Sequence, residues 1–124
     1  SDYKVLFLQG GASQQFAEIA LNLLPEDGVA DYIDTGIWSQ KSIEEASRYG
    51  NVNVAASAKA YDYFAIPGQN EWQLSKDAAY VHYASNETIG GLQFDWVREG
   101  AAPRWWCTCP RTFAPARSTC PSSA

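Results

Sequence analysis

Long apolar runs, a signal peptide and a basic surface are all missing from this sequence of 124 residues. No stretch approaches the roughly 20 apolar residues that a membrane-spanning helix needs, and Ser1–Lys4 does not have the character of a signal peptide. The net charge of −5 argues against a nucleic-acid surface, which requires clustered Lys and Arg. We therefore expect neither a membrane nor a nucleic acid among the partners.

Metal-binding side chains are also scarce. The three cysteines, Cys107, Cys109 and Cys120, are an odd number, so a closed disulfide framework would leave one thiol over. The single histidine, His82, precedes Cys107 by 25 residues, which leaves a zinc site without a fourth ligand. We predict no metal site. The absence of cysteine before residue 107 suits a reducing compartment, and we expect the cytoplasm.

Charge divides the chain into two parts. Residues 1–97 carry five basic and thirteen acidic side chains, a net charge of −8. Residues 98–124 carry four Arg and one Glu, a net charge of +3, together with all three cysteines and four of the six prolines. With 46% apolar and 19% charged residues the chain is globular in composition. We expect one folded body over residues 1–97 and an atypical, poorly ordered tail over residues 98–124, without a sheet element of its own.

The periodicity of the body alternates between strand and helix. Tyr3–Leu8 is an apolar run typical of a buried strand, and Gly10-Gly11 ends it. A helix is expected from Ala12 to Pro25, because apolar residues recur there at helical spacing: Phe16, Ile19, Ala20, Leu23 and Leu24.

A second strand and helix follow. Val29–Ile33 is a predicted strand, and a helix begins at Ser39 or at Ser42, where Ser42 and Glu45 have the spacing of a capping box, and runs to Tyr49. Further strands are predicted at Asn51–Ala55, Ala79–Tyr83 and Gly91–Phe94. This order favours an α/β fold with a mostly parallel sheet flanked by helices.

Three places could bind a ligand at the carboxyl ends of these strands. The Gly10–Ser13 junction suits an anion, since a helix start presents unused N–H groups and small residues let the anion approach; an ordinary strand–helix turn has the same composition. Trp38 could form a flat wall against a planar ligand, or be a core aromatic. Thr88 could donate to a ligand oxygen, or belong to a polar turn. His82, in an apolar strand, is expected to be structural.

Three stretches together are similar to a known family. Gly10-Gly11-Ala12-Ser13, Asp34-Thr35-Gly36-Ile37-Trp38 and His82-Tyr83-Ala84-Ser85-Asn86-Glu87-Thr88 occur in order and at the family's separations. They resemble the phosphoserine aminotransferases, which are fold-type I, class V pyridoxal-phosphate enzymes. The resemblance covers about residues 3–97, roughly a third of a family member. It identifies the body as an incomplete part of the large, cofactor-binding domain.

The resemblance implies a cofactor and a role for each candidate residue. The backbone N–H groups of Ala12 and Ser13 would hold the phosphate of pyridoxal 5'-phosphate, Trp38 would stack on its ring, and Thr88 would form a hydrogen bond with it. Family members transfer an amino group from glutamate to 3-phosphohydroxypyruvate, giving O-phosphoserine and 2-oxoglutarate in serine biosynthesis, and they are homodimers. The family's catalytic lysine and the aspartate that pairs with the pyridine nitrogen have no counterpart here, so we expect this chain to be inactive.

Two other functions stay open from the sequence alone. A small non-catalytic α/β module that binds a phosphorylated metabolite needs only the Gly10–Ser13 junction. A secreted cysteine-containing domain would use the glycosylation sequon Asn86-Glu87-Thr88 and a disulfide in the tail. A phosphate ester that raises the melting temperature favours the first, and glycan on Asn86 favours the second.

We hypothesise that the tail results from a shifted reading frame. Trp105-Trp106 must be encoded TGG-TGG. If the codons of Arg104–Phe113 are read one base out of frame, they can encode Leu-Val-Val-(His or Tyr)-Met-Ser-Ser-Asp-Ile. That run resembles the family's Leu-Val-Val-Asp-Met-Ser-Ser-Asp-Ile at all but the cofactor aspartate. We therefore expect the coding DNA to regain the family's frame after one inserted or deleted base. An intact frame through codon 124 in an independent clone would refute the shift.

Overall fold

The computed structural model describes residues 9–95 and, for the backbone alone, residues 105–108. In chain order, its elements up to residue 61 are the helix α1 (Gly11–Leu23), the strand β1 (Val29–Asp34), the helix α2 (Ile37–Ala46), the strand β2 (Asn51–Ser57) and the 3₁₀ helix η1 (Ala58–Tyr61). They are followed by the 3₁₀ helix η2 (Gln69–Glu71) and the strands β3 (Ala78–Ala84), β4 (Asn86–Glu87), β5 (Leu92–Gln93) and β6 (Trp105–Thr108). The strand predicted at Tyr3–Leu8 lies outside the described residues.

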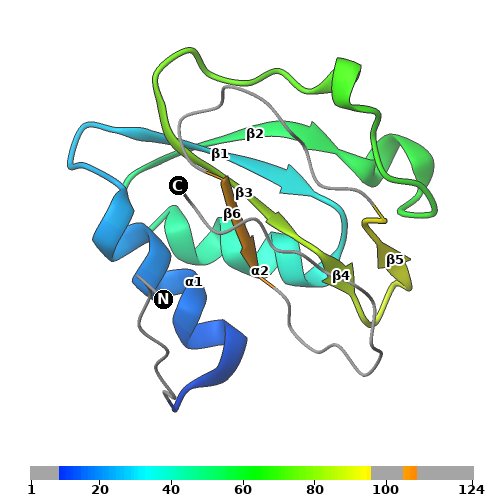
Figure 1. The fold of residues 1–124 in the computed structure, drawn as a ribbon, viewed down its shortest axis with the longest axis horizontal. Helices are drawn as coiled ribbons and strands as arrows, with labels where there is room; N and C mark the ends of the chain where they lie inside the picture. The colour runs from blue at the N-terminus through cyan, green and yellow to red at the C-terminus, as the bar shows by residue number, and fades with distance from the viewer. Residues whose placement is uncertain (1–8, 96–104, 109–124) are drawn as a thin grey trace, which may run out of the picture.

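The centre of the fold is a four-stranded sheet in the order β2-β1-β3-β6 (Figure 1). All three of its strand pairs are parallel, as the alternation of strand and helix predicted. The strands β4 and β5 form a separate antiparallel pair directly after β3. The predicted strand at Gly91–Phe94 is therefore real but shorter, and its partner, β4, was not predicted.

The helices α1 and α2 pack on one face of the sheet. Apolar side chains of both helices form one cluster with the strands β1 and β3, which includes Ile19, Ala20, Tyr32, Ala46 and Tyr80. The helical stripe predicted from Phe16 to Leu24 faces this cluster, with Phe16, Ile19 and Ala20 buried. At its centre the hydroxyls of Tyr32 and Tyr80 lie 2.8 Å apart, and burial raises the pKa of both.

The other face of the sheet is covered by the irregular segment between β2 and β3. Trp72 from this segment packs with Ile33 of β1 and Tyr83 of β3, and its indole N–H donates to the carbonyl of Pro67 at 3.1 Å. On the same side, the fully buried Asp31 accepts hydrogen bonds from Asn53 and from both the N–H and the hydroxyl of Ser75. These bonds hold the segment against the sheet, because a buried carboxylate is costly without partners.

The predicted start of α2 is wrong by at least two residues. Neither Ser39 nor Ser42 begins the helix, which starts at Ile37 after Gly36. The reason is non-local: the first N–H groups of α2 are satisfied by a side chain from β4, far along the sequence. A capping signal read from neighbouring residues could not reveal that partner.

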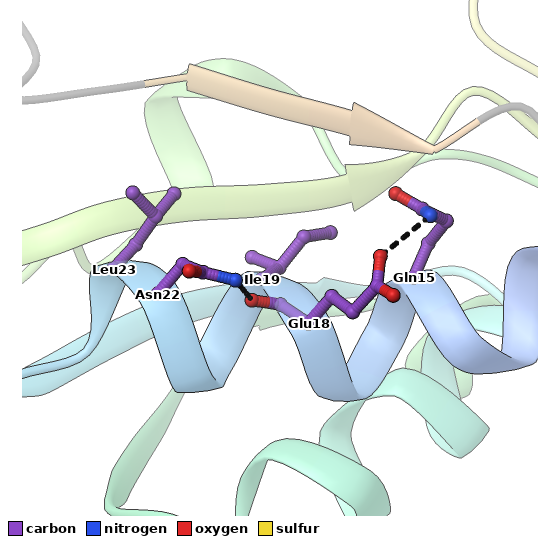
Figure 2. A pocket seen from close by; sticks show the side chains of 5 residues that line it. All are labelled: Gln15, Glu18, Ile19, Asn22 and Leu23. Atoms are coloured by element: carbon purple, nitrogen blue, oxygen red, sulfur yellow. Dashed lines mark hydrogen bonds between the residues drawn. The ribbon is translucent and has the colours of Figure 1, made fainter. Parts of the chain in front are cut away.

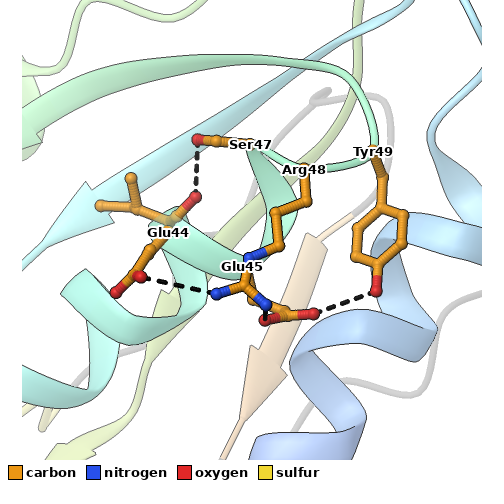
Figure 3. A network of polar contacts seen from close by, with 6 residues as sticks. Glu44, Glu45, Ser47, Arg48 and Tyr49 are labelled. Atoms are coloured by element: carbon orange, nitrogen blue, oxygen red, sulfur yellow. Dashed lines mark hydrogen bonds and ion pairs between the residues drawn. The ribbon is translucent and has the colours of Figure 1, made fainter.

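The end of α2 is made by local contacts. The helix stops at Ala46, and Arg48 and Tyr49 continue as a tighter turn by donating from their N–H groups to Glu45 and Ala46. Figure 3 shows the side chains around this end: Arg48 pairs with Glu44 and Glu45, and the hydroxyl of Tyr49 donates to Glu45 at 3.0 Å. The ion pairs are largely exposed, so they contribute little to stability.

The tail contains a strand, contrary to our expectation. The strand β6 pairs with β3 in parallel, with residue 105 beside Val81 and residue 108 beside Ala84. Trp and Thr favour extended backbone. The edge of β3 that faces away from β1 is open to a further strand, and β6 occupies it. The expected disorder of the other tail residues falls on residues 96–104 and 109–124, which lie outside the described part. The backbone of residues 105–108 does not test the reading-frame hypothesis, which concerns the coding DNA.

His82 is buried in the core, where we expected a structural histidine. Its ring lies against Tyr32 and Phe16, with centroid separations of 4.8 and 6.1 Å. The hydroxyl of Ser42 lies 3.5 Å from its ring nitrogens. Burial lowers the pKa of the imidazole to about 3, so the folded chain holds this side chain neutral across the physiological range.

This pKa gives the fold a pH dependence. Below the ordinary histidine pKa of about 6.5 the unfolded chain binds a proton that the folded chain does not, so stability falls as the pH drops towards about 3. We expect the free energy of unfolding to be about 2 kcal/mol lower at about pH 5 than at about pH 7.5 through His82 alone. Urea denaturation of the chain and of His82→Gln measures this. An equal pH dependence in both proteins would contradict it.

Candidate functional site

The two helix starts lie on the same side of the molecule. Both α1 and α2 run back along one face of the sheet, and their first turns lie toward the side where β1 and β3 end (Figure 1). The predicted ligand residues therefore belong to one edge of the fold: Ala12 and Ser13 in the first turn of α1, Trp38 in the first turn of α2, and Thr88 just after β4. Parallel α/β sheets collect their ligands at this edge.

The start of α1 has the properties of an anion site. Gly10 precedes the helix with a φ of 114°, a left-handed conformation that glycine adopts without strain. The first backbone bond within the helix runs from the N–H of Gln14 to the carbonyl of Gly10, so the helix does not use the N–H groups of Ala12 and Ser13. Gly10 provides no side-chain cap, and among residues 9–95 no side-chain hydrogen bond to this helix start is found; Ser13 is exposed. Those N–H groups can donate to a negatively charged ligand.

The start of α2, in contrast, already holds an anion. The carboxylate of Glu87 accepts hydrogen bonds from the N–H of Trp38 and from the N–H of Ser39, each at 2.8 Å. The hydroxyl of Thr35 lies 3.4 Å from the same carboxylate. The Glu87 side chain is fully buried. A phosphate would therefore be repelled from α2 and attracted to α1.

Trp38 and Thr88 meet although 50 residues separate them. The indole N–H of Trp38 donates to the hydroxyl oxygen of Thr88 at 2.8 Å. Because this oxygen accepts from the indole, the hydroxyl proton of Thr88 can be donated elsewhere. The ammonium of Lys41 lies 4.8 Å from the centre of the Trp38 ring, over one face of it. A planar ligand can stack on the other face.

Two buried groups near this edge were missed by sequence reasoning. Glu87 was noted only as part of the triplet that contains Thr88. Asp34, at the end of β1, accepts from the hydroxyls of Ser57 and Tyr63 at 2.7 and 2.9 Å. Burial, and then the carboxylate of Asp34, raise the pKa of Tyr63. Asp34 is marked in the sequence only as an acidic residue that directly follows the apolar run of the predicted strand, and no comparable signal marks Glu87.

A hollow also lies along the helix α1. It has a volume of about 230 Å³ and runs along α1, as Figure 2 shows, lined by Gln15, Glu18, Ile19, Asn22 and Leu23. The amide of Gln15 donates to Glu18 across it at 2.8 Å, and none of the predicted ligand residues lines it.

Metal-binding clusters and membrane-spanning helices are both absent from residues 9–95 and 105–108. Within these ranges no three His, Cys, Asp or Glu side chains are grouped so that they could hold a metal ion. No helix in these ranges combines the length and the apolar character that crossing a membrane requires.

Solved structures share this fold. The phosphoserine aminotransferase of Bacillus circulans subsp. alkalophilus superimposes with a TM-score of 0.80 and 45% identity, over 84% of this chain and 29% of that one. A pyridoxal-phosphate-bound phosphoserine aminotransferase of Trichomonas vaginalis gives a TM-score of 0.65 and 37% identity, over 77% of this chain and 27% of that one.

Curated relatives are closer in sequence. The phosphoserine aminotransferase of Pseudomonas paraeruginosa is 86% identical over 104 residues, which are 83% of this chain and 29% of that protein. That of Pseudomonas aeruginosa is 89% identical over 99 residues, 80% of this chain and 27% of the relative. The chain thus spans less than a third of the length of these relatives. The family model described as aminotransferase class-V matches residues 1–101, and the chain belongs to the class-V aminotransferases.

Proposed function

We propose that this chain is the part of a phosphoserine aminotransferase that binds pyridoxal 5'-phosphate. The observation that carries the proposal is the contact between the Trp38 indole and Thr88, at the sheet edge toward which α1 begins with Gly10 as an N-cap residue that has no capping side chain. It provides a flat ring, a hydroxyl donor and two backbone donors on one side of the fold. The relatives named phosphoserine aminotransferase, one of them pyridoxal-phosphate-bound, support the same ligand.

The residues fit the two ends of this cofactor differently. The phosphate dianion suits the N–H groups of Ala12 and Ser13, because the positive end of α1 is open whereas Glu87 fills that of α2. The pyridine ring suits the face of Trp38 opposite Lys41, with Thr88 at its edge to donate its hydroxyl proton. Each contact orients the cofactor, and none requires a residue outside the chain.

In the whole protein, we infer, this site serves transamination. An amino group passes from glutamate to 3-phosphohydroxypyruvate, giving O-phosphoserine and 2-oxoglutarate, in a cytoplasmic homodimer. When bound, pyridoxal phosphate supplies the electron sink for that chemistry, while the protein supplies orientation and electrostatics. The lysine and the aspartate that the family uses have no counterpart in the matched motifs, so the chain by itself binds and orients but does not transaminate.

Removing the Trp38 ring should weaken cofactor binding. In the full-length Pseudomonas aeruginosa relative, we expect alanine at the position equivalent to Trp38 to raise the Kd for pyridoxal phosphate about tenfold, because stacking area and the indole bond are lost together. Equilibrium dialysis measures the change. Alanine at the position of Tyr49, an exposed aromatic at the opposite end of α2, should leave the Kd unchanged. Equal affinities in all three proteins would exclude Trp38 from the site.

The chain should not form the covalent link to the cofactor. Lys4, Lys41, Lys59 and Lys76 are its only lysines, and none lies in a motif that the family uses for this link. We expect borohydride treatment of the chain with pyridoxal phosphate, followed by peptide mass spectrometry, to show only low, scattered labelling. Stoichiometric labelling of one lysine would overturn this expectation, and Lys41 beside Trp38 is the first position to inspect.

A further inference from the structure

We propose that Glu87 is a positioning residue that holds Trp38 in the orientation needed to stack on the cofactor. This proposal rests on the function proposed above and adds a residue to its site. Glu87 does not touch the cofactor: its side chain is buried, 1% exposed, beneath the start of α2. It acts through the backbone of Trp38.

The carboxylate fixes the main chain of Trp38 from a distant part of the sequence. One oxygen accepts from the N–H of Trp38 and the other from the N–H of Ser39, both at 2.8 Å. Bonds from N–H groups to a carboxylate are short and strong, especially where water is excluded. Both oxygens are engaged, and the two bonds together restrain the first turn of α2 against β4.

Gly36 makes this approach possible. A Cβ atom added at this position would lie 2.9 Å from the Cδ and from one carboxylate oxygen of Glu87, closer than side chains pack. Glycine at the helix start therefore admits the Glu87 side chain. Gly36, from the Asp34–Trp38 stretch, and Glu87, from the Asn86–Thr88 triplet, therefore pack directly against each other.

The next residue along the chain fixes the other end of Trp38. Thr88 accepts from the indole N–H at 2.8 Å, so Trp38 is held at its backbone by Glu87 and at its ring by Thr88. The turn after β4 keeps these two anchors together: the N–H of Gly91 donates to the carbonyl of Glu87, and the N–H of Phe94 donates to that of Ser85. With both its backbone N–H and its indole N–H held, the Trp38 ring has less rotational freedom than one contact alone would leave it.

Glutamine in place of Glu87 tests this role with little change in volume. Its amide has one acceptor oxygen, so its NH₂ group would face a backbone N–H and that donor would lose its partner. The first turn of α2 would then shift, and the indole with it. The matched control is Asp31→Asn, which alters a buried carboxylate with a similar number of bonds on the opposite face of the sheet, where it contacts neither α2 nor Thr88.

The experiment places both substitutions at the equivalent positions of the full-length Pseudomonas aeruginosa relative. We expect both variants to melt at a lower temperature without cofactor, and Glu87→Gln alone to raise the Kd for pyridoxal phosphate, about tenfold, and to change the circular dichroism of the bound cofactor's absorption band. That band reports the orientation of the cofactor ring, and the Asp31→Asn control shows how far a general loss of stability alters it.

The outcomes separate this inference from the function on which it rests. If Glu87→Gln and Asp31→Asn keep the wild-type Kd and dichroism while alanine at Trp38 weakens binding, Glu87 is a structural cap only and the inference is overturned. If alanine at Trp38 also has no effect, the proposed cofactor site itself is wrong. If both Glu87→Gln and Asp31→Asn change the dichroism equally, the effect is a general loosening of the sheet, which also contradicts a specific role for Glu87.

Discussion

The carboxylate of Glu87 at the start of α2 is the interaction that joins the two halves of the candidate site. It connects the turn after β1 to the turn after β3, segments that are about 50 residues apart. A buried carboxylate and unused helix N–H groups are each costly alone, and here each satisfies the other. The position of Trp38 beside Thr88 follows from this contact.

The same contact makes the two helix starts unequal. Both helices present positive ends to one edge of the sheet, and two such ends could bind anions equally well. Glu87 accepts from the first N–H groups of α2, whereas the N-cap residue of α1, Gly10, provides no side-chain cap. The fold therefore has one helix start and one indole ring at the same edge of the sheet, and the proposal assigns the phosphate of the cofactor to the first and its flat ring to the second.

Local patterns were enough to predict most of the sheet and the first helix. The apolar stripe of α1 and the apolar runs that form β1, β2 and β3 are local features of the sequence. Most of the buried apolar side chains come from these segments. The start of α2, the strand β4 and the role of Glu87 depend on contacts between distant segments, so neither periodicity nor capping rules could find them. Ala12, Ser13, Trp38 and Thr88 were selected by resemblance as well as by pattern, and their roles stay predictions.

The strand β6 shows a different limit of sequence reasoning. The family match ends at residue 101, yet residues 105–108 extend the sheet beside β3. Backbone pairing needs an open edge and residues that tolerate extended geometry, and it does not need the family's side chains. A strand in this place is therefore compatible with a tail that has lost the family's sequence, as the reading-frame hypothesis requires.

The crystal structure of the full-length protein with pyridoxal phosphate tests the central claim most directly. The account predicts the phosphate within hydrogen-bonding distance of the N–H groups of Ala12 and Ser13, and the pyridine ring flat against Trp38, whose N–H still donates to Glu87. A phosphate at the start of α2, or an indole turned away from the ring with the Glu87 contact intact, would contradict it.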